Sequence, residues 1–156
     1  MAVGAVDNFF SQLDIRYGYV AKADGNRDLP VLAQLGRYDR PVGSRLHMRL
    51  GRSETISSRN IISHCERHTN DMTLQYYGFV VVTACAVKLG QVSPWPQEGD
   101  SGSPVYDYVT SGGNVIGVAA YGVLFGRELW YGVLPTGNFY IAHFDSLPVY
   151  VKVTIQ

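Results

Sequence analysis

Short runs of β-branched and aromatic residues, separated by polar and glycine-containing stretches, dominate the hydrophobic pattern of this chain. No segment keeps apolar residues at the helical spacing i, i+3, i+4, i+7 for three turns, so the pattern predicts strands rather than helices. The spacing of the runs indicates an antiparallel barrel or sandwich. Strands are expected at residues 13–21, 31–36, 44–50, 59–66, 75–86, 103–109, 114–121, 128–134, 138–143 and 149–154.

Turn residues mark the expected breaks between these strands. The breaks fall at residues 24–26, 39–41, 68–71, 93–96 and 111–114. Residues 87–100 contain two prolines that flank Trp95, and they predict a long ordered loop between two strands. Long ordered loops often carry binding or catalytic residues, so this segment is the first place to look for chemistry.

Composition and charge narrow the classes of function. The chain has 156 residues, of which 46% are hydrophobic, which is enough for one domain with its own core. Thirteen basic residues balance 13 acidic ones, and this zero net charge argues against a surface that binds nucleic acid or an acidic membrane. No apolar run of about 18 residues predicts a transmembrane helix, and residues 1–10 lack the pattern of a signal peptide.

The segment Gly99–Pro104 has the composition of a sharp turn that exposes a hydroxyl group. Ser101 lies between Gly99 and Gly102, and glycine allows backbone conformations that other residues avoid. Consecutive N–H groups of such a turn can converge on one point and bind an oxyanion. Pro104 is then expected to end the turn, and a strand begins after it.

The six residues Gly-Asp-Ser-Gly-Ser-Pro at 99–104 resemble the GDSG(G/S)P nucleophile motif of chymotrypsin-like (trypsin-like) serine proteases. The resemblance implies that Ser101 is the nucleophile and that the N–H groups of Gly99 and Ser101 form the oxyanion hole. It also implies that Asp100 fixes the loop through a buried ion pair. The implied fold is an all-β antiparallel barrel of the chymotrypsin-like type, one complete barrel plus part of another. Residues 42–156 would form the Ser-bearing barrel, and residues 1–41 a remnant of the first barrel or an N-terminal arm.

Flanking segments extend the resemblance. Residues 114–122 resemble the strand that walls the primary specificity pocket, so Ala120, Tyr121 and Gly122 would bind substrate, although Ala120 stands where the family usually has Ser. Residues 76–86 and 42–52 resemble two other strands of the Ser-bearing barrel. Trp95 occupies a position before the Ser where the family often has a specificity residue, and the lack of an acid there argues against cleavage after Lys or Arg.

A catalytic triad also needs a base and a group that orients it, and in this family they precede the Ser in the order His, Asp, Ser. The TAxHC-like motif that carries the His is absent. His64, in "IISHC", has a superficial likeness to it but falls inside the region matched to the second barrel. Asp7 is the candidate orienter and Asp14 the fallback, and a solvated Asp near the terminus is the alternative interpretation.

These residues imply a serine-type endopeptidase that hydrolyses peptide bonds through an acyl-enzyme, truncated or inactive alone, with a polypeptide substrate and no cofactor. The missing base implies a His-bearing segment upstream of this chain, and family membership implies a secreted or extracytoplasmic location. Two alternatives stay open: a non-catalytic pseudoprotease β-barrel that binds peptides or a protein partner, and a small viral or processing protease that uses His64. No motif supports binding of nucleic acid, nucleotide or membrane.

Two cysteines, Cys65 and Cys85, allow at most one internal disulfide. A hairpin that turns near residue 75 would bring them opposite each other, at a Cα–Cα distance of roughly 4.4–6.8 Å. Two buried free thiols are the alternative. A zinc site at His64, Cys65 and His68 is not favoured, because a second matching pair of ligands is missing.

Overall fold

The computed structural model of the chain describes residues 18–21, 28–70, 81–146, 153, 155 and 156. These residues form an all-β fold, and neither an α-helix nor a helix able to cross a membrane occurs among them. A short 3-10 turn, η1 (Phe144–Ser146), follows the last strand. The strands are β1 (Tyr19–Val20), β2 (Leu29–Gln34), β3 (Arg45–Leu50), β4 (Thr55–Asn70), β5 (Val81–Ser93), β6 (Pro104–Ser111), β7 (Asn114–Trp130) and β8 (Leu134–His143).

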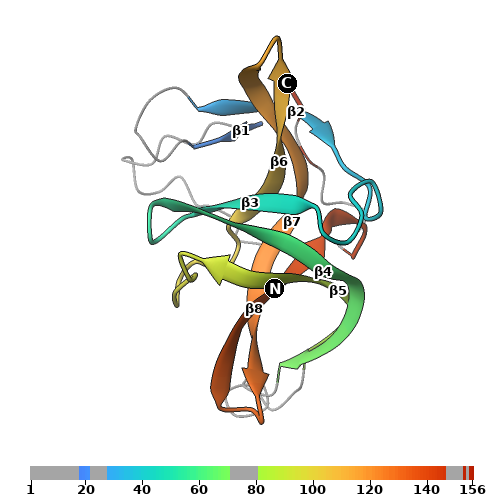
Figure 1. The fold of residues 1–156 in the computed structure, drawn as a ribbon, viewed down its shortest axis with the longest axis vertical. Coiled ribbons are helices and arrows are strands. Elements are labelled where there is room, and N and C mark those ends of the chain that lie inside the picture. Colours follow the sequence, from blue (N-terminus) through green and yellow to red (C-terminus); the bar gives the residue numbers. More distant parts are fainter. Residues whose placement is uncertain (1–17, 22–27, 71–80, 147–152, 154) are drawn as a thin grey trace, which may run out of the picture.

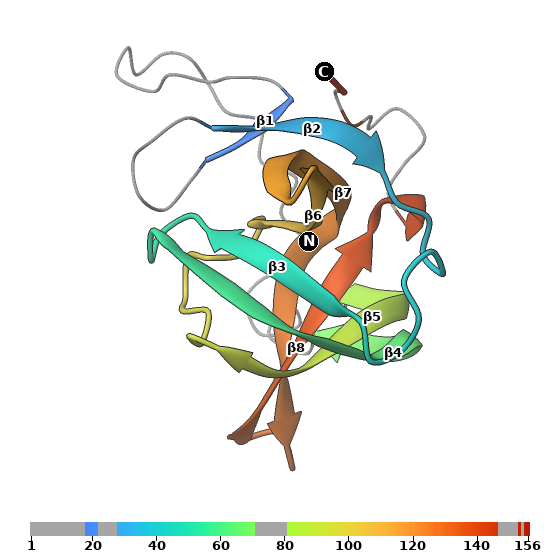
Figure 2. The ribbon, with the colours of Figure 1, turned by 45° about the horizontal axis from the view of Figure 1, so that its top comes forward.

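Six of these strands are joined by antiparallel pairing into an uneven ring (Figure 1). The pairing runs β3–β4–β5–β8–β7–β6 and returns to β3. The ring is uneven because β3 and β6 share only two residue pairs, His47 with Tyr106 and Met48 with Val105. Outside the ring, β2 runs parallel to β7 and pairs with β1, so the eight-stranded sheet is mixed (Figure 2).

Alternation of side chains along the ring strands builds the main core. In β3, Leu46, Met48 and Leu50 are fully buried, whereas the residues between them point away from the core. Strands β5 and β8 contribute in the same way through Val87, Leu89, Phe139 and Ile141. A second apolar cluster lies where β1 and β2 cover β6 and β7, and it contains Val20, Leu29, Val31, Tyr106, Val118 and Ala120.

Two sequence-based boundaries are wrong. The loop expected at residues 87–100 is strand as far as Ser93, because Val87 and Leu89 alternate into the core. The break expected between residues 121 and 128 is also absent, since β7 is one strand of 17 residues. Gly122 makes this continuity possible: a Cβ atom there would lie 2.3 Å from the carbonyl oxygen of Ala142 on β8.

Other boundaries agree with the pattern. Strands β2, β3 and β6 lie close to their expected ranges, and turns occur at the expected breaks at residues 39–41, 93–96 and 111–114. Strand β4 continues to Asn70, past the break expected to begin at His68. The predictions at residues 13–17, 24–26 and 75–80, and most of those at 149–154, lie outside the described residues.

The predicted disulfide between Cys65 and Cys85 is confirmed. It joins β4 to β5, and the two Cα atoms are 4.3 Å apart, just below the expected range. The bridge fixes the two strands to each other at a place where their register is irregular.

Candidate functional site

The segment Gly99–Pro104 forms a tight turn that leads into β6. The φ angles of Gly99 and Gly102 are 95° and 90°, a region that residues with a Cβ atom rarely adopt. Two hydrogen bonds hold the turn: Gly102 N–H donates to the carbonyl oxygen of Leu124 (2.7 Å), and Ser103 N–H to that of Asp100 (3.1 Å). Ser101, at the outside of the turn, is exposed.

The carboxylate of Asp100 anchors this turn from within. Asp100 is only 1% exposed, and its two oxygens accept four hydrogen bonds from neutral donors. The donors are Arg52 N–H (2.9 Å), Ser53 N–H (3.0 Å), the Ser53 hydroxyl (2.5 Å) and Gln97 N–H (2.8 Å). Burial would raise the pKa of Asp100, but these bonds outweigh it and the pKa is lowered.

The resemblance implies a buried ion pair at Asp100, and the described residues do not supply one. Among the described residues no cationic side chain pairs with its carboxylate. The guanidinium of Arg52 instead donates to the carbonyl oxygen of Glu98. Neutral amide and hydroxyl groups supply the compensation that the family resemblance assigned to a charge.

The turn between β3 and β4 completes the anchor, and it is a part of the site that the sequence did not indicate. Gly51 N–H donates to the Ser103 hydroxyl (3.0 Å), which itself donates to the Asp100 carbonyl oxygen (2.6 Å). The segments in contact here are about 50 residues apart in the sequence, so no local pattern could pair them.

The polar groups that the resemblance assigns to catalysis are not used by this anchor. Within the described part of the chain, the N–H groups of Gly99 and Ser101 and the Ser101 hydroxyl form no hydrogen bond. They remain available to a ligand, as an oxyanion hole requires. Convergence of the two N–H groups on one point stays a prediction.

A pocket of about 360 Å³ opens beside Ser101. Leu124 and Phe139 from the core give it an apolar part, and Glu98 and Arg127 are exposed charged residues that also line it. Gly126 lines the pocket on β7, with His68 packed beside it. The pocket can therefore take an extended apolar group close to the Ser101 hydroxyl.

The residues predicted to bind substrate lie next to this pocket in the sequence but do not line it. Ala120, Tyr121 and Gly122 are buried in the middle of β7, and the later part of the same strand reaches the pocket instead. Trp95 is 51% exposed and its ring lies over Gly137. A role in substrate binding for these four residues stays a prediction.

His64, on β4, and His143, at the end of β8, do not line the pocket beside Ser101. His64 Nε2 lies 2.7 Å from the carbonyl oxygen of Arg40, and its ring stands edge-on to Tyr38. His143 is buried: Nε2 lies 2.8 Å from the Leu35 carbonyl oxygen, and Nδ1 accepts the N–H of Asp145 (3.0 Å).

The other two histidines contact aromatic rings. His47 packs against Tyr106 and Tyr108, and burial lowers its pKa. His68 packs against Phe125 and Tyr140 and also lies beside Gly126, a residue of the Ser101 pocket. No described histidine forms a hydrogen bond with Ser101. Asp7 and Asp14, the candidate orienters, lie outside the described residues.

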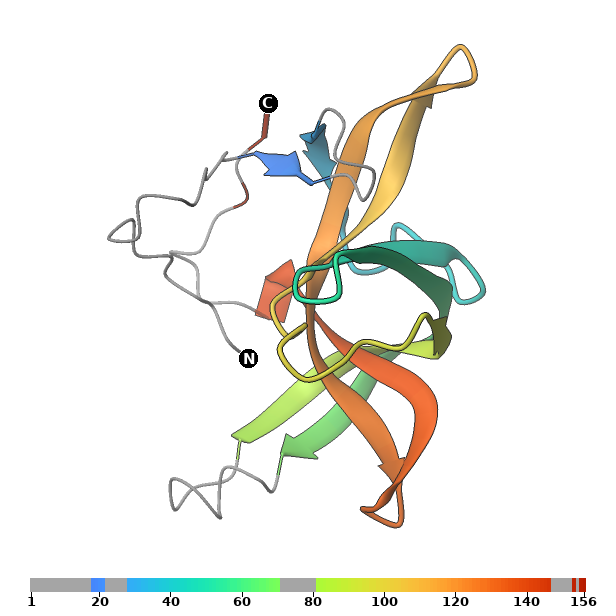
Figure 3. The ribbon, with the colours of Figure 1, turned by 90° about the vertical axis from the view of Figure 1, so that its left-hand side faces the viewer.

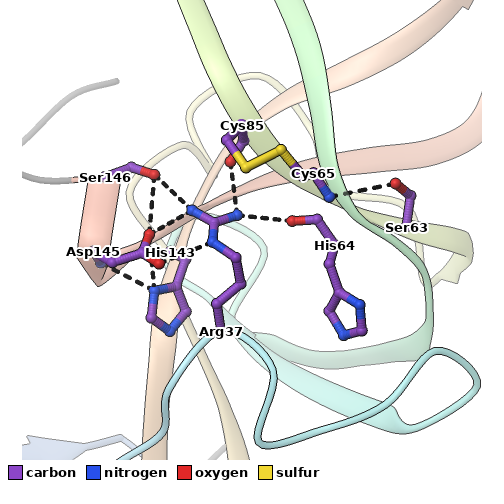
Figure 4. Close-up of a disulfide and its surroundings, with 8 residues drawn as sticks. All are labelled: Arg37, Ser63, His64, Cys65, Cys85, His143, Asp145 and Ser146. Atoms are coloured by element: carbon purple, nitrogen blue, oxygen red, sulfur yellow. Dashed lines mark hydrogen bonds and ion pairs between the residues drawn. A yellow bond between two sulfur atoms is a disulfide. The ribbon is translucent and has the colours of Figure 1, made fainter.

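A second polar cluster surrounds Arg37, close to the disulfide (Figure 4). The Arg37 side chain is 6% exposed; it pairs with the carboxylate of Asp145 and donates to the Ser146 hydroxyl (2.8 Å). It also donates to the carbonyl oxygens of His64 (2.7 Å) and Cys85 (2.8 Å). The guanidinium of Arg37 lowers the pKa of Asp145 to about 2.

The cluster around Arg37 joins segments of the fold, because the guanidinium uses its N–H groups on Asp145, Ser146 and two backbone carbonyl oxygens. Among the described residues no group of three His, Cys, Asp or Glu side chains is arranged to hold a metal ion. Comparisons of the chain with protein-family models, with curated proteins and with solved structures give no match. The resemblance to a protease family therefore depends on the residues of the Ser101 turn and their surroundings.

Proposed function

We propose that this chain is the Ser-bearing part of a chymotrypsin-like serine endopeptidase, in which Ser101 attacks the scissile peptide bond and forms an acyl-enzyme. The observation that carries the proposal is the state of the Ser101 turn. An exposed hydroxyl stands beside a pocket, next to two unbonded N–H groups, on a turn that a buried carboxylate anchors. Together these features match what nucleophilic attack and oxyanion binding require of a site.

The strand arrangement supports the proposal in a second way. Under it, the uneven ring of β3 to β8 is the Ser-bearing barrel, and β1 and β2 belong to the N-terminal region that covers it. The ring lines the pocket through β7 and β8, which pair with each other beside the turn, and the loop residues Pro96, Gln97 and Glu98 line it as well. This arrangement would hold a side chain of the substrate while Ser101 reacts.

The base is the part of the site that the described residues do not bring to Ser101. A serine hydroxyl is a weak nucleophile at neutral pH and needs a group that accepts its proton. The chain has four histidines: three bond or pack elsewhere, and His68 lies beside Gly126 of the pocket but forms no hydrogen bond with Ser101 among the described residues. The proposal therefore assigns the base to a separate polypeptide segment and expects little proteolysis by this chain alone.

The test is labelling by a fluorophosphonate probe with added imidazole, which can replace a missing base. Modified residues are located by mass spectrometry in the wild type, in Ser101→Ala and in the control Ser111→Ala, which removes an exposed hydroxyl far from the pocket. Ser101 is expected to react at least about tenfold faster than Ser111, since oxyanion donors accelerate reactions of this type. Labelling that rises with imidazole and is lost only in Ser101→Ala supports the proposal.

A non-catalytic peptide-binding module is the second candidate, and the absence of a hydrogen bond to the Ser101 hydroxyl among the described residues favours it. If Ser101 and Ser111 react equally slowly with the probe, the catalytic proposal fails. Peptide binding that survives Ser101→Ala, measured by fluorescence anisotropy, would then identify the binding module.

A further inference from the structure

The end of the β7–β8 hairpin is the most apolar exposed surface of the described residues. Its six residues are Leu129, Trp130, Tyr131, Gly132, Val133 and Leu134, which we call the hairpin tip. Trp130 is 59% exposed, Tyr131 82%, Val133 73% and Leu134 55%. No charged residue occurs between Glu128 and His143. Figure 3 shows this hairpin extending from the ring, opposite in direction to the β6–β7 hairpin.

The backbone of the hairpin tip is a tight turn that favours small or polar residues, yet it carries a large ring. Tyr131 and Gly132 both have positive φ, 49° and 71°, and Val133 N–H donates to the Trp130 carbonyl oxygen (3.2 Å). Two central residues with positive φ define a turn in which Asn and Gly are preferred. Tyr131 has an unfavourable backbone conformation, and its side chain is exposed. This combination indicates that the side chain has a function.

The β6–β7 hairpin shows how the same kind of turn is built without that cost. Its central residues are Gly112 and Gly113, with φ angles of 56° and 82°. Its exposed apolar residues, Val115 and Ile116, are 48% and 46% exposed and lie behind the polar turn rather than in it. Of these two hairpins, only β7–β8 carries aromatic residues in its turn.

A fixed base supports the hairpin tip. Glu128 accepts hydrogen bonds from Thr136 Oγ1 (3.0 Å), Asn138 Nδ2 (3.0 Å) and Tyr140 OH (3.2 Å), and it pairs with Lys88 on β5. Burial would raise the pKa of Glu128, but these bonds outweigh it and keep the pKa low. The hairpin is therefore ordered before it meets a partner, which reduces the entropic cost of binding.

The shape and chemistry of the hairpin tip fit a lipid bilayer better than a protein. A stable protein interface buries about 800 Å² on each partner, and six residues on a convex tip offer much less. A bilayer surface needs no such complementarity. Trp and Tyr prefer the headgroup layer of membranes, and Val and Leu prefer the hydrocarbon beneath it.

We propose that the hairpin tip, Leu129–Leu134, inserts into the interfacial layer of a phospholipid bilayer and anchors the protein peripherally. The driving force is burial of apolar surface, since the chain has no net charge to attract an acidic membrane. Binding is therefore expected with zwitterionic lipid and is expected to persist at high salt. The proposal is independent of the chemistry assigned to Ser101.

The chain contains two tryptophans, and this allows a direct test. Trp95→Phe leaves Trp130 as the only tryptophan, and Trp130→Phe leaves Trp95. With phosphatidylcholine vesicles, the Trp130 emission is expected to shift to shorter wavelength and to be quenched by brominated lipid. The Trp95 emission in Trp130→Phe is expected to change in neither way.

Variants at the two hairpins provide the matched comparison in a vesicle flotation assay. The double variant Tyr131→Asp/Val133→Asp is expected to lower the bound fraction at least about tenfold, because it puts two charges at the inserted end. Asp tolerates positive φ better than Tyr, so the fold is retained, and a thermal unfolding scan checks this. The control Val115→Asp/Ile116→Asp is expected to bind as the wild type does.

Absence of vesicle binding by the folded wild type would overturn the proposal. Binding that the Tyr131→Asp/Val133→Asp variant leaves unchanged would overturn it as well. So would concentration-dependent dimers, detected by analytical ultracentrifugation, that this variant abolishes while vesicles bind neither form. In that last case the hairpin tip contacts a second copy of the chain.

Discussion

Asp100 and Asp145 each tie an irregular segment to the strand ring, but their surroundings differ. Asp100 is 1% exposed, and within the described part of the chain its carboxylate is bonded by neutral amide and hydroxyl groups alone. The side chain of Asp145 is 48% exposed and depends on one buried cation, Arg37. At Asp100 the carboxylate itself is buried and is surrounded by hydrogen-bond donors. At Asp145 the carboxylate is half exposed, and the buried charge is that of Arg37.

The two aspartates hold their segments in different ways, one through local hydrogen bonds and the other through a buried arginine. Four donors aimed at Asp100 fix the shape of one turn and leave the neighbouring Ser101 unbonded. Arg37 instead joins segments that are distant in the sequence, since it bonds to β4, β5 and the turn after β8. Asp100 shapes a local site, and Arg37 with Asp145 holds parts of the chain together.

The largest effect is expected from Asp100→Ala. The change leaves Arg52 N–H, Ser53 N–H and Gln97 N–H without their acceptor in a partly buried place, which costs about 3 kcal/mol of unfolding free energy. Urea unfolding followed by circular dichroism measures it. Probe labelling of Ser101 is expected to fall as well, because the turn loses its anchor.

Glu98→Gln is the matched control for this prediction. It removes a carboxylate from the same loop, but Glu98 is exposed and only its backbone carbonyl is bonded. The expected change in unfolding free energy is within about 0.5 kcal/mol. An equal loss in Asp100→Ala and Glu98→Gln would contradict the special role of Asp100.

A smaller loss is expected from Arg37→Met, which keeps a long side chain but removes the guanidinium. The carbonyl oxygens of His64 and Cys85 then lose their donor, at a cost of about 2 kcal/mol, while Asp145 is free to turn to water. Thermal and urea unfolding measure the loss. Arg45→Met, at an exposed position of β3, is the control and is expected to change little.

The smallest effect is a dependence of stability on pH. The pKa of Asp145 is about 2 in the folded chain and about 3.9 for an unfolded Asp, so its contribution is present above about pH 4 and lost as pH falls toward 2. Solvent screens this exposed group, so the change is modest. Urea titrations at pH 6 and about pH 3 are expected to differ less in Asp145→Asn than in the wild type. An identical difference in both would exclude a role for Asp145.

Local pattern accounts for much of the fold. Alternation in β3 follows directly from the sequence, because Leu46, Met48 and Leu50 repeat at the strand period. The pairing of Cys65 with Cys85 follows from a hairpin whose centre lies midway between them. The hydrophobic runs predicted two strands, at 114–121 and 128–134, where β7 is continuous from Asn114 to Trp130. Gly122 allows this strand a close approach to β8.

The site divides in the same way. The glycines on either side of Ser101 predict a turn with an exposed hydroxyl. The positive φ angles of Gly99 and Gly102 agree with this prediction. The identity of the groups that bond Asp100 could not be predicted, since they come from a turn between two other strands. The pocket beside Ser101 is lined on β7 by Leu124, Gly126 and Arg127. The role in substrate binding predicted for the earlier residues of this strand stays a prediction.

The sequence by itself determined the all-β class, the strand period and the turn at Gly99–Pro104, because each depends on a few neighbouring residues. It left two free thiols open as the alternative to the disulfide, which the structure shows. Only the tertiary structure decided that Gly51–Ser53 holds the Ser101 turn and that Arg37 pairs with Asp145, 108 residues away. It also decided that the hairpin tip stays exposed. The physical reason is that polar partners and solvent exposure are set by the folding of distant segments against one another, and no local periodicity encodes that.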